Sequence, residues 1–407
     1  LYKRTLEIVE KTLGPEHLHV AIALNNLAFL YGRQGRYAEA EPLYKRSLAI
    51  KEKALGTEHP SFVLSLNNLA VLYTIQGRYG EAIKLQRRGN SILRQRFTAR
   101  DIEETKGLLS EQQSQRWNFL VHVDLALNRK QTGERSELES EAFEVLQLTR
   151  SSSTGSAIAR MAARFAASNS VVMGLVREQQ DAMAKYQTLD DLLIKTLGAP
   201  TEQRNETQEA NLRNEITSLQ SRIQTLNEKI TTQFPEYAEL TRREPISLKE
   251  TQSLLGDDEA LLTTIRSRYG KQTHVFVLRP DRSTVYTVDI GIDELEKMVK
   301  QLRASLDISS GALEPFDFKV AYELYDRLLS PAEPYLDGVK HLFLVPDGPL
   351  ESLPFHLLVT EDPDTVSVQG QSDSDQRGLT QDSGSGQVAV TGNVHLPWLA
   401  QKYAMTT

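Results

Sequence analysis

The sequence predicts an α plus α/β protein with three parts: a helical solenoid over residues 1–97, a helical region over 98–245 and an α/β domain over 246–407. Three observations predict this division. The first part contains a long internal repeat, and the second shows apolar residues at helical spacing. In the third, short runs of β-branched and aromatic residues alternate with amphipathic stretches, which is typical of strands and helices in one domain.

The repeat is a 42-residue unit that occurs twice in residues 1–84, with 25 identities in 42 positions and no gap. Within each unit, apolar residues at helical spacing predict two helices, and Gly35 and Gly77 separate them. A fixed period of this length predicts stacked helix pairs, because one pair cannot bury its own apolar face.

Between the units, Gly14 and Gly56 are typical of helix C-caps, and Pro60 suits the first turn of the next helix. Residues 1–13 match only the second helix of a unit, and the chain does not begin with Met. We therefore expect a fragment of a longer array, with further repeats before Leu1.

The motif LNNLAxLYxxQGRYxEA resembles the tetratricopeptide (TPR) repeat in its 42-residue form. The resemblance implies a groove for a protein or peptide, with Asn25, Asn26, Asn67 and Asn68 on the concave face of the first helix of each unit. An Asn side chain offers both a donor and an acceptor, so it can bind the backbone of an extended peptide. Alternatively, the paired Asn residues only solvate the groove.

The charge is unevenly distributed. The net charge is −7, yet residues 1–97 hold 15 Lys and Arg against 8 Asp and Glu, which gives +7. Residues 361–386 hold six acids and only Arg377, which gives −5. A basic array favours an acidic peptide partner, unless these charges are simply a solvated helix surface.

The composition, with 40% apolar and 25% charged residues, is typical of a globular protein, and no apolar run is long enough for a membrane span. We expect a cytoplasmic protein that binds neither membranes nor nucleic acid. No phosphate-binding glycine loop is present, and His17, His19 and His59 lack partner ligands, so no cofactor or metal is expected. The absence of Cys excludes disulfides, thiolate metal sites and a cysteine nucleophile within these residues.

The middle region contains a short coiled-coil-like seam. Apolar residues step by 4, 3, 4, 3, 4 from Leu212 to Ile230, as at the a and d positions of a coiled coil. Because the seam is shorter than three heptads, it predicts an intramolecular hairpin against residues 171–197. The stripes Met161 to Phe165 and Val171 to Val176 are predicted core.

The third part predicts strands at 261–265, 273–279, 284–289 and from His341, and amphipathic helices at 292–306 and 318–330. A Pro-Asp-Gly turn and a second apolar segment follow the strand at His341. Residues 361–391 are rich in Ser, Gly, Gln and Asp, which predicts a low-complexity, mobile surface insertion. The sequence WLAQKYA near the end predicts a helix.

The succession ISLKETQSLLGDDEALLTTI, THVFVL and HLFLVPDGPLESLPFHLLV resembles the first part of a CHAT domain, a caspase-like domain often found behind TPR arrays. Residues 346–350 and 353–355 carry the most specific elements. The resemblance implies an α/β sheet with a His/Cys dyad that cleaves peptide bonds, or an inactive relative that only binds. In the family the dyad lies beyond the position of Thr407, so we expect an incomplete domain that binds without cleaving.

The leading interpretation is thus TPR-mediated protein binding coupled to a caspase-like cysteine peptidase whose catalytic residues lie beyond this chain. The alternative is a non-catalytic scaffold or sensor. A third interpretation is a hydrolase built from Ser352, His356 or His341 and Asp347. It is disfavoured because no GxSxG-type elbow presents the serine.

Overall fold

The computed structural model describes residues 1–57, 59, 61–98, 105–127, 135–149, 170–237, 245–306, 315–364, 380–381, 388–389 and 397–407. Pro60, the stripe from Met161 to Phe165 and most of the insertion 361–391 lie outside these residues. The chain divides into two compact units, one of residues 1–135 and 145–245 and the other of residues 136–144 and 246–407.

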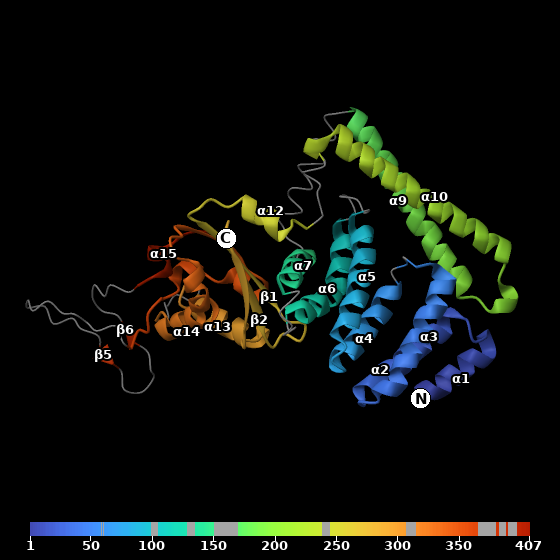
Figure 1. Cartoon of the computed structure of the whole chain (residues 1–407), viewed down its shortest axis with the longest axis horizontal. Coiled ribbons are helices and arrows are strands. Elements are labelled where there is room, and N and C mark those ends of the chain that lie inside the picture. Colours follow the sequence, from blue (N-terminus) through green and yellow to red (C-terminus); the bar gives the residue numbers. More distant parts are fainter. Residues whose placement is uncertain are drawn as a thin grey trace, which may run out of the picture. The chain divides into compact units, whose positions relative to one another are not determined.

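The first unit begins with helices joined by short turns, as the repeat predicts (Figure 1). They are α1 (Tyr2–Leu13), α2 (Leu18–Arg33), α3 (Tyr37–Leu55), α4 (Ser61–Ile75), α5 (Tyr79–Thr98) and α6 (Thr105–Leu127). The predicted breaks at Gly14, Gly35, Gly56 and Gly77 are confirmed, since each of these residues has a φ between 74° and 87°, which favours glycine. The predicted TPR-type helix pairs are therefore confirmed in the described residues.

The Arg and the Glu of the Gly-Arg-Tyr-x-Glu signature make the same contacts in both units. The guanidinium of Arg36 lies 4.0 Å from the ring centroid of Tyr31, and that of Arg78 lies 3.8 Å from that of Tyr73. Each Arg also bonds the Glu three residues later. Cation–π and bidentate contacts of this kind lock the turn between the two helices of a unit.

The predicted hairpin is confirmed. After α7 (Arg135–Leu148), helices α9 (Ser170–Leu197) and α10 (Glu206–Gln233) lie side by side, joined through a short 3-10 helix, η1 (Thr201–Gln203). The seam is buried against α9 in three clusters, which contain Leu212 with Ile216, Ile223, and Ile230. Of the predicted Val171 to Val176 stripe, Val172 and Val176 are buried, but Val171 is exposed.

The hairpin packs along the loops that precede α2 and α4. His17 and His59 are equivalent in the repeat, and the Nδ1 of each accepts the backbone N–H two residues on. The Nε2 of His17 lies 2.9 Å from the carbonyl of Ala199, and that of His59 lies 3.2 Å from a carboxylate oxygen of Asp190. The repeated Glu-His dipeptide thus supplies helix caps that also hold the hairpin.

The second unit contains a five-stranded sheet in the order β3-β2-β1-β4-β7. Its strands are β1 (Glu259–Arg266), β2 (Thr273–Leu278), β3 (Ser283–Val288), β4 (His341–Val345) and β7 (Ala404–Thr406). The first three form an antiparallel meander, while β4 pairs parallel to β1, and β7 pairs parallel to β4. The strands predicted near 261, 273, 284 and 341 are confirmed, and so is the α/β class.

Two amphipathic helices cover one face of this sheet (Figure 1). Helices α13 (Ile292–Ala304) and α14 (Phe318–Leu328) pack on a core that includes Ala260, Leu262, Val275 and Val277. Shorter elements complete the unit: α12 (Leu248–Ser253), η3 (Ser330–Tyr335), η4 (Gly348–Ser352), η5 (Phe355–Leu357), α15 (Leu399–Lys402) and the strand pair β5 (Thr380–Gln381) with β6 (Val388–Ala389).

The prediction of a helix over WLAQKYA is wrong in part. Helix α15 has only four residues, and the backbone of Tyr403 is extended. From Ala404 the chain pairs with β4, and the Ala404 N–H donates to the carbonyl of Lys340. Ladder pairing with an available strand edge overrides the weak local helix preference of this short segment.

One buried cation in α3 yields a first prediction. Lys51 is 7% exposed, and its Nζ donates to the carbonyl of Ser61 and the hydroxyl of Ser65. Burial lowers the pKa of Lys51 to about 8. Below this pH the folded protein bears a desolvation cost, which disappears as the pH rises toward the unfolded value of 10.5.

We expect Lys51→Met to raise the free energy of unfolding by about 1–3 kcal/mol at neutral pH, because it removes the buried charge and keeps the apolar stem. The gain should shrink as the pH rises from 8 toward 10.5. Denaturant unfolding of the full chain measures it, with the exposed Lys53→Met on the same helix as control. A destabilised Lys51→Met would mean that the two hydrogen bonds outweigh the desolvation cost.

A second prediction concerns Glu41, which links the two repeats. Its carboxylate accepts from Arg78 at 2.7 Å and from the Tyr73 hydroxyl at 3.0 Å, and it pairs with Lys45. The hydrogen bond from Arg78, followed by that from Lys45, lowers the pKa of Glu41 to about 2. The resulting stability is present above pH 4.5 and is lost as the pH falls toward 2.

Glu41→Gln should therefore lower the free energy of unfolding by about 1–2 kcal/mol at neutral pH, and the difference from the natural chain should vanish near pH 2. Glu16→Gln is the control, because its ion pair with Lys53 is exposed and contributes little. Thermal unfolding measures the stability of both variants. An equal loss of stability in Glu41→Gln and Glu16→Gln would contradict this account.

Candidate functional site

The four predicted Asn residues do not share one environment. Asn25 and Asn67 are buried, with 5% and 1% exposure, whereas Asn26 is exposed and Asn68 is half-buried. Neighbouring residues on a helix lie about 100° apart around its axis, so only one member of each pair faces outward. Of the four residues, only Asn26 and Asn68 keep exposed surface, and their part in binding a peptide stays a prediction.

The buried amides connect helices. The Nδ2 of Asn67 donates to Oδ1 of Asn118 in α6, and the Nδ2 of Asn68 donates to Oδ1 of Asn25 at 3.4 Å. Buried polar atoms need such partners. Asn25 and Asn67 thus bond neighbouring helices, Asn68 keeps part of its amide exposed beside its bond to Asn25, and Asn26 is exposed.

Both accessible amides lie within rows of outward-facing residues at helical spacing. We call these two rows the amide face, which consists of Ile22, Asn26, Phe29 and Arg33 of α2 and the repeat-equivalent Leu64, Asn68, Val71 and Ile75 of α4. The two helices are neighbours, since Asn68 of one bonds Asn25 of the other. The same arrangement thus occurs on α2 and α4, with an Asn at the centre and an apolar residue one turn before and one turn after it.

The apolar members of this face were not predicted from the sequence. Leu24, Leu27 and Tyr31 belong to the apolar stripe at helical spacing along α2, and this stripe is buried. Ile22 and Phe29 fall between the core positions and stay about half exposed, at 50% and 51%. Apolar residues that recur outside the core stripe at equivalent repeat positions were the signal that could have found them.

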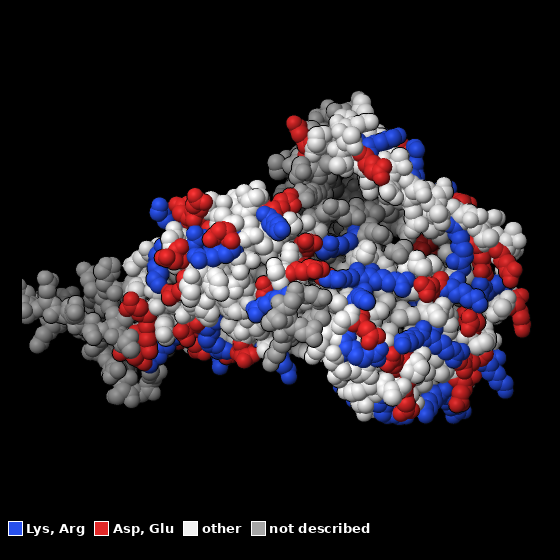
Figure 2. All heavy atoms as spheres, viewed as in Figure 1, with Lys and Arg blue, Asp and Glu red and all other residues white. Residues whose placement is uncertain are grey.

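Charge is sparse on the amide face. Arg33 is its only charged residue, and it has no ion pair or hydrogen bond with any residue that the structure describes. Elsewhere in residues 1–97, six of the eight acids pair with a Lys or Arg. On the side drawn in Figure 2, basic and acidic side chains of the helices are interspersed.

In the second unit, the Pro-Asp-Gly turn that follows β4 is a structural element. The Asp347 carboxylate accepts from the backbone N–H of Arg266 at 3.4 Å, and the Asp347 N–H donates to the Thr264 hydroxyl at 3.0 Å. Gly348 has a φ of 61°, which disfavours other residues. The turn thus fastens the end of β4 to the end of β1, and Leu350, Leu353 and Phe355 enter the core behind it.

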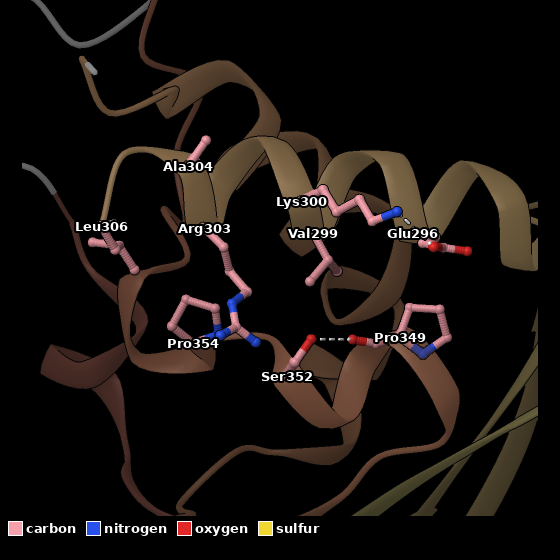
Figure 3. A pocket seen from close by; sticks show the side chains of 9 residues that line it. All are labelled: Glu296, Val299, Lys300, Arg303, Ala304, Leu306, Pro349, Ser352 and Pro354. Carbon is pink, nitrogen blue, oxygen red and sulfur yellow. Dashed lines mark hydrogen bonds and ion pairs between the residues drawn. The ribbon is translucent and has the colours of Figure 1, made fainter. Parts of the chain in front are cut away.

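A cavity of about 1120 Å³ lies between α13 and η4 (Figure 3). Glu296, Lys300 and Arg303 border it along the helix, and Ser352 borders it from the opposite side. The Ser352 hydroxyl donates to the carbonyl of Pro349 at 3.0 Å, and no histidine is among the described residues that line the cavity. A serine whose proton is held within its own turn, and which hydrogen-bonds no side-chain base among the described residues, lacks the geometry of an activated nucleophile.

The histidines proposed for the hydrolase are engaged elsewhere or point to solvent. The Nε2 of His341 hydrogen-bonds Thr406 at 2.8 Å, and its ring stacks on Phe343 with the centroids 4.5 Å apart. His356 is exposed. Within the described residues these groups therefore do not form a triad, because the hydrogen bonds of Ser352, Asp347 and His341 join them to other groups and His356 is exposed.

Two absences apply to the described part of the chain. No helix there is both long enough and apolar enough to cross a membrane. No group of three or more His, Asp or Glu side chains there is placed to hold a metal ion.

Comparison with known proteins adds two family matches. The tetratricopeptide repeat model matches residues 1–53 and 20–95, which covers α1 to α4 and most of α5. The CHAT domain model matches residues 319–393, from the start of α14 through β4 and the Pro-Asp-Gly turn. A search of curated proteins found no match. Residues 1–95 of the chain thus match tetratricopeptide repeats, and residues 319–393 match a CHAT domain.

Proposed function

We propose that the chain is a protein-binding module and that the amide face of α2 and α4 holds the partner. Tetratricopeptide repeats imply protein–protein interaction. The observation that supports this face is its repetition, because Asn26 and Asn68 occupy equivalent positions on neighbouring helices and keep exposed surface. Asn25 and Asn67, in contrast, are buried and bond neighbouring helices.

The chemistry suits an extended segment. Each accessible amide offers a donor and an acceptor, which match the C=O and N–H of a peptide backbone. The axes of packed helices are about 8–10 Å apart, and an extended chain advances about 3.3 Å per residue. A segment that crosses α2 and α4 therefore brings backbone groups about three residues apart to Asn26 and Asn68.

The binding proposal predicts that Asn26→Ala combined with Asn68→Ala weakens the capture of a peptide selected on the full chain by about 1–3 kcal/mol, because the amide hydrogen bonds are lost. Fluorescence anisotropy measures the affinity, and circular dichroism shows that the helices persist. Asn211→Ala, an exposed amide on α10, is the matched control. If the double variant binds as the natural chain does, the amides do not hold the ligand.

The CHAT half supports a second candidate function, a caspase-like peptidase coupled to the binding array. A caspase-like mechanism needs a thiolate nucleophile, and the 407 residues contain no Cys. We propose that these residues bind without cleaving, either as part of a peptidase whose dyad lies on further residues or as a scaffold or sensor that performs no catalysis.

This proposal predicts no cleavage of a fluorogenic peptide library by the purified chain, and no difference between the natural chain and Ser352→Ala. Heat-inactivated protein sets the background rate. Cleavage above that background, abolished by Ser352→Ala or His356→Ala, would establish the serine hydrolase that the geometry argues against.

A further inference from the structure

The amide face carries the most exposed large apolar side chains of α2 and α4. Ile22 and Phe29 are 50% and 51% exposed, and Leu64 and Ile75 are 54% and 53% exposed. Seven residues separate the first two, and eleven separate the second two, so each pair repeats at a whole number of turns and shares one side of its helix. Exposed apolar groups that gather on one side of neighbouring helices mark an interaction surface more often than scattered ones do.

The apolar side chains flank the accessible amides on both sides. Ile22 precedes Asn26 by one turn and Phe29 follows it by one turn, and Leu64 and Val71 flank Asn68 in the same way. In an extended segment, successive side chains point to opposite sides of the backbone. The backbone of a segment that crosses both helices lies on the two amides. Its side chains then point alternately toward Ile22 and Leu64 on one side and toward Phe29 and Val71 on the other.

Charge complementarity allows the partner an acidic group only near Arg33, at one end of the amide face on α2. The excess of basic residues over residues 1–97 suggests an acidic partner, but it is not gathered on the amide face, where Arg33 is the single charged residue. Its repeat equivalent on α4 is Ile75. A uniformly acidic segment would place carboxylates against Leu64, Phe29 and Ile75, where each would lose hydration without gaining a partner.

We propose that the amide face binds an extended protein segment with apolar side chains on both sides of its backbone and one acidic side chain that pairs with Arg33. This inference rests on the proposed function and specifies the partner's chemistry. The apolar contacts supply affinity, the amides hold the backbone, and Arg33 orients the segment, because a carboxylate placed at the α4 end would meet Ile75 instead of a cation.

The test uses the full chain and an array of short synthetic segments in three classes: apolar with one acidic residue, acidic without apolar residues, and neutral polar. We expect the first class to be retained. For a retained segment, Leu64→Asp should weaken binding about tenfold or more, because it removes a buried contact and introduces an unpaired charge. The control Leu192→Asp changes an exposed leucine of α9 and should leave the affinity unchanged.

Arg33→Glu should weaken binding of the segment that carries the acid and leave its Asn-substituted or Gln-substituted version unaffected. Circular dichroism confirms that each variant is folded. Retention of the acidic class alone, with sensitivity to Asn26→Ala and Asn68→Ala, would overturn this inference while the proposed function stands. If the retained segments bind the amide variants and Leu64→Asp as tightly as the natural chain, the result counts against this inference and the proposed function. The same holds if no segment is retained.

Discussion

The stacking of helix pairs at a 42-residue period is the constraint on which the first unit depends. The contacts within each repeat recur because the residues recur: Arg36 and Arg78 lie over Tyr31 and Tyr73, and His17 and His59 cap α2 and α4. Once packing directs one side of each helix inward, the remaining side is fixed by helix geometry. The accessible amides and the apolar rows around them are therefore consequences of the stack.

The second unit depends on a different contact, the one between the ends of β1 and β4. Thr263 donates its hydroxyl to the carbonyl of Val345, and Asp347 bonds the backbone of Arg266. These bonds satisfy polar groups where the parallel ladder ends, and the positive φ of Gly348 then turns the chain toward η4. The Pro-Asp-Gly turn lies within the residues matched to the CHAT domain, and in this structure it fastens the end of β4 to the end of β1.

Much of this architecture could be predicted from the sequence. Apolar periodicity located the repeat helices, the α9 and α10 hairpin and the strands, because each of these elements buries one regular face. The strand at Ala404–Thr406 could not be predicted, since it forms by pairing with β4 and its three residues carry no period of their own. The roles of the Asn pairs were also hidden, because sequence shows two adjacent amides but not that Asn67 bonds Asn118. Exposure of Ile22 and Phe29 became visible only when the buried side of α2 was known.

The central claim is that the partner lies on the side of α2 and α4 that packing leaves free. Site-specific photo-crosslinking tests it most directly: a photoreactive phenylalanine analogue replaces Phe29 in the full chain, and mass spectrometry maps its attachment to a bound peptide. The matched position is Tyr269, an exposed aromatic residue of the second unit. The account predicts attachment at position 29 and none at position 269. Attachment at position 269, or equal yields at the two positions, would contradict it.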